Sequence, residues 1–481
     1  MVGKAKVLTN FLWRLAERSG AQLVQFVVSI VLARILAPEV YGSIALVTVF
    51  TTVLNVFVDS GMGNALIQKK DADDLDFSTV FFFNITACLL LYALMFLAAP
   101  FIADFYHMPE LTWVIRVLSL TIVISGLKNV QQAYVSRTMQ FKRFFFATLG
   151  GTVGAAVVGI AMACMGFGIW ALVAQQLFNT MVDTMVLWVT VRWRPKRMFS
   201  LQRLKGLFSF GWKLLLSAVL DSIYNNIRQL IIGRVYSSED LAYFNRGKQF
   251  PYFFITNINT AIDSVLLPTL SREQDNRERV REMTRRVIKI STYIMAPMML
   301  GIAACAEPLV RIVLTEKWLP CVPFMRIFCV ALIFYPVHTA NLNAMKALGR
   351  SDLFLKLEIL KKIVGIIILV ISMQFGLMAL AYSLILETAC AIFLNSWPNR
   401  KLIRYTTLQQ IWDFLPGIAM AAAMAVLVYL LGYTGLPDLL LLPLQILAGA
   451  VIYLGGSILF RIDSFAYLMD TLKNIRNVKK V

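Results

Sequence analysis

The chain has 481 residues, of which 59% are hydrophobic and only 15% are charged, and its mean hydropathy is +0.70. A water-soluble domain of this length does not keep such a large apolar fraction off its surface, so the composition excludes a soluble globular protein. The net charge of +19 does not indicate a nucleic acid partner. The basic residues gather in alternate loops between apolar segments, which is a signal of membrane topology.

The apolar segments predict helices that cross a bilayer. A hydrocarbon core about 30 Å thick needs roughly 20 apolar residues per helix, and helices satisfy their own backbone hydrogen bonds there. We expect an all-α polytopic membrane protein with about 14 transmembrane helices. The spans begin near Phe11, Tyr41, Ser78, Leu111, Phe144, Phe167, Leu207, Leu241, Thr284, Val322, Phe354, Met378, Phe414 and Leu441.

The distribution of charge predicts how the spans are oriented. Loops after even-numbered spans are rich in Lys and Arg, as in segments 192–205 and 400–404, whereas loops after odd-numbered spans are short and often acidic. Arg311 and Lys317 are the exceptions. By the positive-inside rule, both termini are expected in the cytoplasm. We expect no cleaved signal peptide, because the first apolar run is long and partly polar.

An internal repeat relates the first span to the seventh. The first span opens with a Trp-basic pair at Trp13 and turns at Pro38, and the seventh opens with such a pair at Trp212 and turns at Ser237. Because six spans separate the copies, both halves enter the membrane in the same orientation, as in a parallel repeat. We therefore expect an N-terminal lobe (1–200, spans 1–6) and a C-terminal lobe (201–400, spans 7–12) around a central cavity. Two further helices and a tail follow at 401–481.

Polar residues recur on one face of both repeated spans. The first span carries Arg14, Arg18, Gln22, Gln25 and Ser29, and the seventh carries Lys213, Ser217, Asp221, Tyr224 and Arg228. Spacings of four and three residues place each set on one helix face. A charge near the bilayer centre costs roughly 2.5 to 3.5 kcal/mol, so these stripes are expected to face water, protein or ligand.

We expect the two stripes to line one cationic cavity that binds an anionic substrate. Guanidinium groups pair well with phosphate or carboxylate. The predicted substrate-binding residues are Arg14, Arg18, Gln22, Gln25, Lys213, Tyr224 and Arg228. The alternative is that the basic residues near the helix starts reach lipid headgroups, while the deeper polar residues form hydrogen bonds between helices.

Acidic residues inside the spans are candidates for binding a coupling proton or sodium ion. Asp221 shares the second stripe with Arg228, and Asp59 lies at the end of the second span. The alternative is that the intramembrane acids neutralise nearby Lys or Arg. No other cofactor and no metal are expected, because the cysteines and histidines lack metal-ligand spacing. Free thiols are favoured, with a Cys305–Cys321 disulfide as the alternative.

Several short segments occur in an order that matches a known group of transporters. They are LARILAPEVYG (32–42), DSGMGNALIQKKD (59–71), GFGIWALVAQQ (166–176), FNRGKQFP (244–251), LLPTLSR (266–272) and EPLVRIVLTEKW (307–318). Over nearly the whole chain the sequence resembles the polysaccharide transporter family of the multidrug, oligosaccharidyl-lipid and polysaccharide exporter superfamily.

The resemblance implies a flippase that moves an undecaprenyl-pyrophosphate-linked repeat unit to the outer leaflet by alternating access, for exopolysaccharide, capsule or O-antigen synthesis. Spans 1 and 7 would line its cavity. The membrane would be the plasma (inner) membrane of a bacterium. The implied partners are the lipid-linked oligosaccharide and the bilayer, with polysaccharide polymerase and chain-length proteins as further partners.

Two other classes of function are weighed against a flippase. A cation or drug exporter of the same superfamily should have an aromatic and acidic cavity, and the basic stripes argue against it. A membrane enzyme of polysaccharide assembly usually needs a sizeable extramembrane loop with catalytic carboxylates. The chain has short outer loops and no nucleotide-binding motif, so we expect a transporter that is not an enzyme.

Overall fold

The computed structural model describes residues 4–59, 62–69, 71–138 and 142–469. Within the helices, the side chains of residues 4–19, 59, 64, 142–144, 146–147 and 210 are not described. The described residues form helices and turns, and no β-strand occurs among them. The chain divides into two compact units, Met1–Ala242 (unit 1) and Tyr243–Val481 (unit 2).

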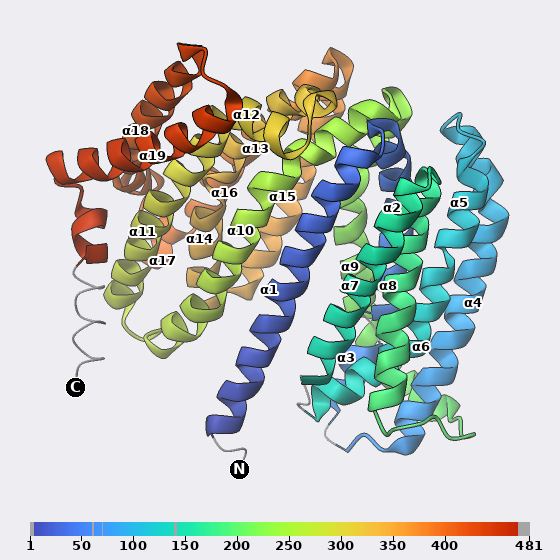
Figure 1. Cartoon of the computed structure of the whole chain (residues 1–481). Coiled ribbons are helices and arrows are strands. Elements are labelled where there is room, and N and C mark those ends of the chain that lie inside the picture. Colours follow the sequence, from blue (N-terminus) through green and yellow to red (C-terminus); the bar gives the residue numbers. More distant parts are fainter. Residues whose placement is uncertain (1–3, 60–61, 70, 139–141, 470–481) are drawn as a thin grey trace. The chain divides into compact units, whose positions relative to one another are not determined.

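Unit 1 is a bundle of long helices (Figure 1). Its helices are α1 (Lys4–Ile35), α2 (Pro38–Asp59), α3 (Met62–Gln68), α4 (Asp74–Phe105), α5 (Leu111–Leu118), α6 (Leu120–Arg137), α7 (Lys142–Cys164), α8 (Ile169–Thr190) and α9 (Leu201–Val235). α7 packs closely on α8 and α1, α4 packs on α6, and α2 packs on α9. The α7–α8 contact needs glycine, because a Cβ atom at Gly154 would lie 2.8 Å from the Phe178 ring.

One buried carboxylate joins three segments at one end of unit 1. Asp73 and Asp76 form a capping box at the start of α4, in which each carboxylate accepts a hydrogen bond from the other residue's backbone N–H. The Asp76 side chain is fully buried and lies 2.6 Å from Lys69 Nζ and 3.4 Å from Arg203 Nη1. Asp76 thus fixes the end of α3 and the first turn of α9 to α4.

Unit 2 contains the rest of α10 (Ser238–Arg272) and the helices that follow it. They are α11 (Arg277–Ala304), α12 (Ala306–Val313), α13 (Val322–Leu332), α14 (Tyr335–Ala347), α15 (Ser351–Ser372), α16 (Leu377–Ser396), α17 (Asn399–Leu402), α18 (Thr407–Leu430) and α19 (Asp438–Leu459), with 3-10 turns at Glu316–Cys321, Met373–Phe375 and Leu431–Thr434. α11 packs along α18, and α13 packs on α11 and α16.

Buried amides tie the second half of unit 2 together. Asn341 on α14 donates to Gln410 Oε1 on α18 at 2.8 Å, and its own Oδ1 accepts from Gln410 Nε2 at 3.0 Å. Asn399 on α17 donates to the same Asn341 oxygen at 2.7 Å. All three side chains are fully buried. These bonds satisfy amides that would otherwise lose free energy in an apolar interior.

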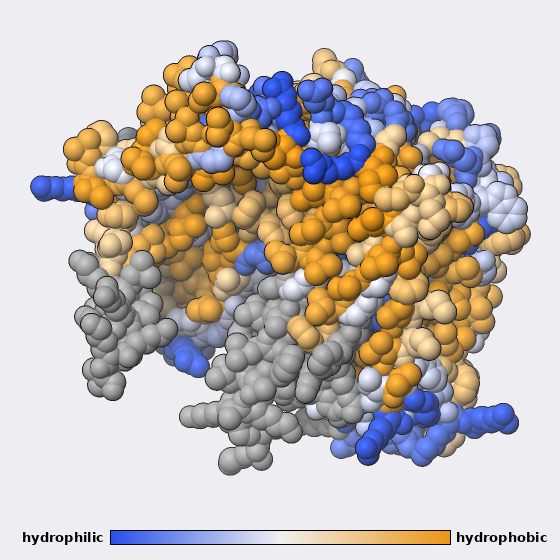
Figure 2. Space-filling model, viewed as in Figure 1, coloured by the Kyte–Doolittle hydropathy of each residue, from blue (hydrophilic) through white to orange (hydrophobic). Residues whose placement is uncertain are grey.

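Among the described residues, eight helical segments are long and apolar enough to cross a membrane, and α9, bent by 51° between Ser209 and Gly211, is a ninth if both parts count as one span. Figure 2 shows apolar residues over the middle of the visible face of unit 1, with hydrophilic residues near the helix ends. The chain is a multi-pass membrane protein. Each predicted span start lies within a helix, except Phe167, which precedes α8 by two residues. The count of fourteen spans stays a prediction, because some helices do not meet the criteria of length, hydropathy and charge. Examples are α10, which is polar, and α15, which is apolar but carries several charged residues.

The repeated turn has the same form in both copies. α1 ends at Ile35 and α2 begins at Pro38, and α9 ends at Val235 and α10 begins at Ser238, with two residues between the helices in each case. The two turns also meet within unit 1, where a Cβ atom at Gly42 would overlap the Ser238 backbone. The boundary between the compact units follows residue 242, so α9 groups with unit 1. The lobes 1–200 and 201–400 stay predictions.

Candidate functional site

The polar stripe of α1 borders a face that packs into unit 1. Ala21, Val28 and Leu32 on this face are buried, with exposures of 6%, 5% and 1%. Gln25 lies at nearly the same angle around the helix but is exposed, and Gln22 is half-buried. A polar side chain that stays accessible on an otherwise packed face borders a space that water or a ligand can enter. The substrate-binding role of Gln25 stays a prediction.

The stripe of α9 lies on an accessible part of the helix. Lys213 and Asp221 are exposed, and Tyr224 and Arg228 are half-buried where the helix approaches its neighbours. Leu220, which lies beside the stripe, is 55% exposed. Both polar and apolar side chains are therefore accessible in the middle of α9. The stripe differs from the rest of the helix surface in its polarity, not in its exposure.

The two stripes belong to one unit but lie on helices that do not pack closely on each other. Among the described residues, α1 packs mainly on α7, and α9 packs on α2, α3 and α4. The side chains of Arg14, Arg18 and Asp59 lie outside the described residues. A shared cavity between the stripes therefore stays a prediction.

The seventh span carries further polar residues that the stripe pattern does not include. Asn226 donates to the backbone oxygen of Ser222 at 2.8 Å, and Gln229 donates to Asn226 Oδ1 at 3.3 Å. Together they place amide groups next to Arg228 along the half-buried part of α9. The pair Asn225-Asn226 inside a predicted span is the sequence signal that could have identified them.

Some intramembrane acids are neutralised by lysines within the same unit. Asp183 on α8 lies 2.6 Å from Lys128 Nζ on α6, and Glu358 lies 2.6 Å from Lys361 Nζ on α15. These two acids therefore neutralise nearby lysines, which is the alternative to binding a coupling ion. Asp221, which is exposed on the α9 stripe, stays the candidate for a coupling ion. All six cysteines are free thiols, so the alternative Cys305–Cys321 disulfide is wrong.

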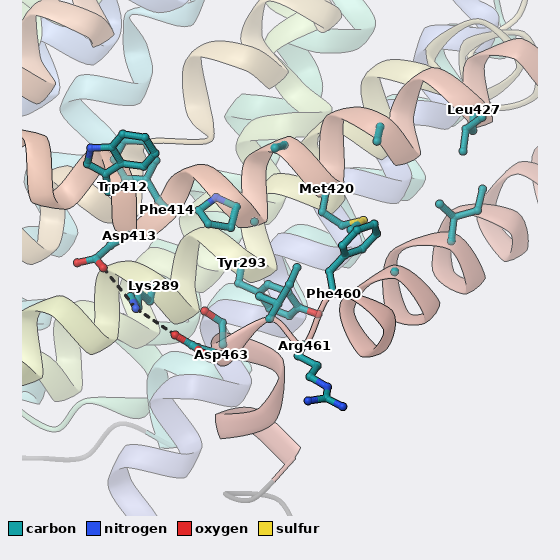
Figure 3. A pocket seen from close by; sticks show the side chains of 18 residues that line it. Lys289, Tyr293, Trp412, Asp413, Phe414, Met420, Leu427, Phe460, Arg461 and Asp463 are labelled. Carbon is teal, nitrogen blue, oxygen red and sulfur yellow. Dashed lines mark ion pairs between the residues drawn. The ribbon is translucent and has the colours of Figure 1, made fainter.

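A pocket of about 740 Å³ lies in unit 2 between α11, α18 and α19 (Figure 3). Its body is apolar, with Met420 and Phe460 among the lining side chains. One end is ionic, because Lys289 Nζ lies 3.3 Å from an Asp413 oxygen and 3.6 Å from an Asp463 oxygen. Figure 3 shows Lys289 between these two carboxylates.

The ionic end of the pocket is held by further hydrogen bonds. Arg285 donates to both oxygens of Asp413, at 2.6 and 2.7 Å, and the Tyr405 hydroxyl donates to the same carboxylate at 2.8 Å. Burial raises the pKa of Tyr405, so its hydroxyl stays a donor at neutral pH. Deeper in the pocket wall, Tyr293 donates to Ser457 at 2.6 Å and joins α11 to α19. Lys289 and Arg285 are paired with carboxylates, and the apolar body suits a hydrocarbon chain.

Comparisons with known proteins agree with this architecture. The family model described as "Polysaccharide biosynthesis protein" matches residues 31–323. The succinoglycan biosynthesis transport protein ExoT of Rhizobium meliloti is 27% identical over 316 residues, which cover 65% of this chain and 64% of that protein. The teichuronic acid biosynthesis protein TuaB of Bacillus subtilis is 26% identical over 306 residues, 63% of each chain. The chain therefore matches slightly less than two thirds of the length of each of these two relatives.

Solved structures show the same fold at low sequence identity. The lipid II flippase MurJ in an inward closed conformation aligns with a TM-score of 0.75 and 14% identity over 94% of this chain and 99% of that one. An inward-facing multidrug resistance transporter of the MATE family aligns with a TM-score of 0.61 and 18% identity, over 85% and 98% of the two chains. The resemblance noted from the sequence is confirmed. Since the family match covers more than half of its residues, the chain belongs to the family of polysaccharide biosynthesis proteins.

Proposed function

We propose that this protein is a flippase that moves a lipid-linked oligosaccharide from the cytoplasmic to the outer leaflet by alternating access. The observation that carries the proposal is the family match in a chain with the MurJ fold. The relatives' names support it: one is a succinoglycan transport protein, another is a lipopolysaccharide biosynthesis protein of Escherichia coli, and MurJ is a lipid II flippase. The glycan would serve an exopolysaccharide, a capsule or an O-antigen.

The proposed mechanism requires no covalent step. A pyrophosphate crossing hydrocarbon loses its hydration, which makes unaided flipping slow. Lys213 and Arg228 on α9, with Arg14 and Arg18 on α1, would replace part of that hydration by charge-assisted hydrogen bonds. Amide groups such as Gln25 would bind the sugar hydroxyls. Movement of the two lobes would then open the cavity to the other side.

The unit 2 pocket supports a lipid-linked cargo. Its apolar body of about 740 Å³ between α11, α18 and α19 suits part of a prenyl chain. The paired charges of Lys289 and Asp413 leave that end without a strong preference for a second anion. The tail would therefore stay in an apolar environment while the headgroup crosses.

The remaining features of the proposal concern topology, energy and partners. The chain would cross the bacterial inner membrane fourteen times, with both termini in the cytoplasm, as the basic loops indicate. Turnover would be coupled to a proton or sodium ion at Asp221 or Asp59. Polysaccharide polymerase and chain-length proteins would receive the flipped unit.

The runner-up function is ion-coupled export of drugs or other small molecules, because the fold is shared with a MATE transporter. The basic stripes favour an anionic cargo over the cations that an acidic, aromatic cavity would bind. An enzyme of polysaccharide assembly is disfavoured because ExoT is named a transport protein and MurJ a flippase.

Reconstitution in liposomes tests the proposal directly. The substrate is a fluorescent undecaprenyl-pyrophosphate oligosaccharide, and dithionite reports the fraction exposed in the outer leaflet. We expect flipping that depends on the protein, with no uptake of a cationic dye by the same vesicles. Dye transport without lipid flipping would assign the protein to drug export instead.

A further inference from the structure

Unit 1 contains a second apolar space, separate from the predicted polar cavity. Two adjoining pockets of about 470 and 390 Å³ share the side chains of Phe83, Phe208 and Trp212, and so form one groove between α4 and α9. Leu94 on α4 lines its far end, and Lys205 on α9 lines the other. We call this space the α4–α9 groove.

The groove exists because α9 turns away from α4. The segments Leu201–Ser209 and Gly211–Val235 meet at 51°, and the groove residues Phe208 and Trp212 lie on either side of this bend. Along α4 the groove runs from Phe83 to Leu94, about 16 Å at the helical rise. Leu94 is 58% exposed and Trp212 is 42% exposed, so the groove opens to the surroundings of the helices. In a bilayer, hydrocarbon fills such a surface, because a void forfeits contact with the apolar walls.

Lys205 distinguishes this groove from an ordinary lipid-facing surface. Two other cations of the same basic segment are paired, Lys196 with Asp74 and Arg203 with Asp76. Lys205 is exposed and forms no salt bridge with any residue that the structure describes. It lies near the basic, polar end of unit 1, whereas the rest of the groove runs along an apolar span. The described lining of the groove therefore has one cation, at one end of an apolar space about as long as a hydrocarbon chain segment.

We propose that the α4–α9 groove binds an acyl chain of an anionic phospholipid, whose phosphate lies at Lys205. Among the described residues that line the groove, Lys205 is the one cation. Its charge matches the single charge of a phosphodiester headgroup. A prenyl pyrophosphate carries more charge and calls for a cluster of donors, which the groove does not supply. The assignment does not depend on which cargo the protein transports.

Photo-crosslinking tests this site with the full-length protein. Vesicles of phosphatidylcholine contain a small fraction of phosphatidylglycerol with a diazirine on one acyl chain, and labelled peptides are mapped after irradiation. We expect labels to concentrate in segments 83–94 and 204–215. Lys205→Gln should lower this labelling about fivefold, the effect of one lysine near an anionic surface. The matched control is Lys401→Gln, at an exposed lysine of unit 2, which should leave the labelling unchanged.

A second pair of variants tests the groove itself. Ala87 lines the groove, so Ala87→Trp should fill it and abolish labelling of both segments. Ala93 on the exposed part of α4 gives the control Ala93→Trp, which should retain labelling. The proposal is overturned if labels spread evenly over the lipid-facing helices, or if phosphatidylcholine with the same diazirine labels the groove equally. Stronger labelling by a prenyl phosphate probe than by phosphatidylglycerol would also overturn it.

Discussion

Replacing Asp413 by Asn should destabilise the contact between α11 and α18. The Asp413 side chain is 5% exposed and accepts two hydrogen bonds from Arg285, at 2.6 and 2.7 Å, with Lys289 at 3.3 Å. Removing one partner of a buried ion pair costs about 3–5 kcal/mol, because the other charge is left uncompensated. Arg285 is 47% exposed, and solvent screening lowers the expected loss to about 2 kcal/mol. Asn keeps an oxygen that accepts the hydrogen bond from the Tyr405 hydroxyl and has nearly the size of Asp. The substitution therefore tests the carboxylate charge and leaves the packing largely unchanged.

A double-mutant cycle measures this interaction. The unfolding free energy is determined in mixed micelles for the wild type, Asp413→Asn, Arg285→Gln and the double variant. We expect a coupling energy of at least about 1 kcal/mol between the two positions, as is typical of residues in direct contact. A coupling energy below about 0.5 kcal/mol, the range of independent sites, would refute the role given to this ion pair.

Three further substitutions follow from contacts in unit 1, with the unfolding free energy as the measurement. Gly42→Ala places a Cβ atom 1.6 Å from the Ser238 oxygen, so we expect a loss of about 1–3 kcal/mol or more. Lys128→Ala leaves Asp183, only 14% exposed, without its cation and should cost about 3 kcal/mol, much of which a second change to Asn at Asp183 should restore. Asp76→Asn removes the charge that pairs with two cations and should cost about 2 kcal/mol.

Each substitution has a control. Gly150 on α7 has no atom within 4 Å of an added Cβ, so Gly150→Ala should keep or raise stability. The control for Lys128→Ala is Asp183→Asn with Lys128 intact. Its unfolding free energy shows how much of the loss comes from breaking the ion pair and how much from removing the lysine side chain. A Gly42→Ala protein as stable as the Gly150→Ala protein would contradict the close contact between the repeated turns. An unchanged free energy for Asp76→Asn would show that the buried carboxylate does not hold α3 and α9 to α4.

The helices were predictable because their signals are local. Apolar runs gave the all-helical class and a helix at or beside each predicted start. The boundaries were less accurate where charges lie inside a helix. The predicted starts at Ser78 and Phe414 lie inside helices that begin at Asp74 and Thr407. A charged side chain such as Asp413 can lie within a helix because a partner distant in the sequence, Arg285, compensates its charge.

The candidate site was predictable only in part, because local sequence patterns do not show which helices pack against each other. The spacing of polar residues identified the stripes of α1 and α9, and their role in binding a substrate stays a prediction. A stripe shows which face of a helix is polar, but not which helix lies opposite. The pairing of Asp183 with Lys128, 55 residues away, depends on tertiary packing that no local pattern contains. The paired charges of Lys289, Asp413 and Asp463 at one end of the unit 2 pocket depend on packing in the same way.

The most direct test of the proposed cationic pathway is the flipping rate of the fluorescent undecaprenyl-pyrophosphate oligosaccharide in proteoliposomes. The rate is measured for the wild type, Arg18→Ala, Arg228→Ala and the control Lys401→Ala at equal protein content. We predict rapid flipping by the wild type and the control, and a marked loss in both arginine variants. Normal flipping by both arginine variants would contradict transport through a cavity lined by the stripes of α1 and α9.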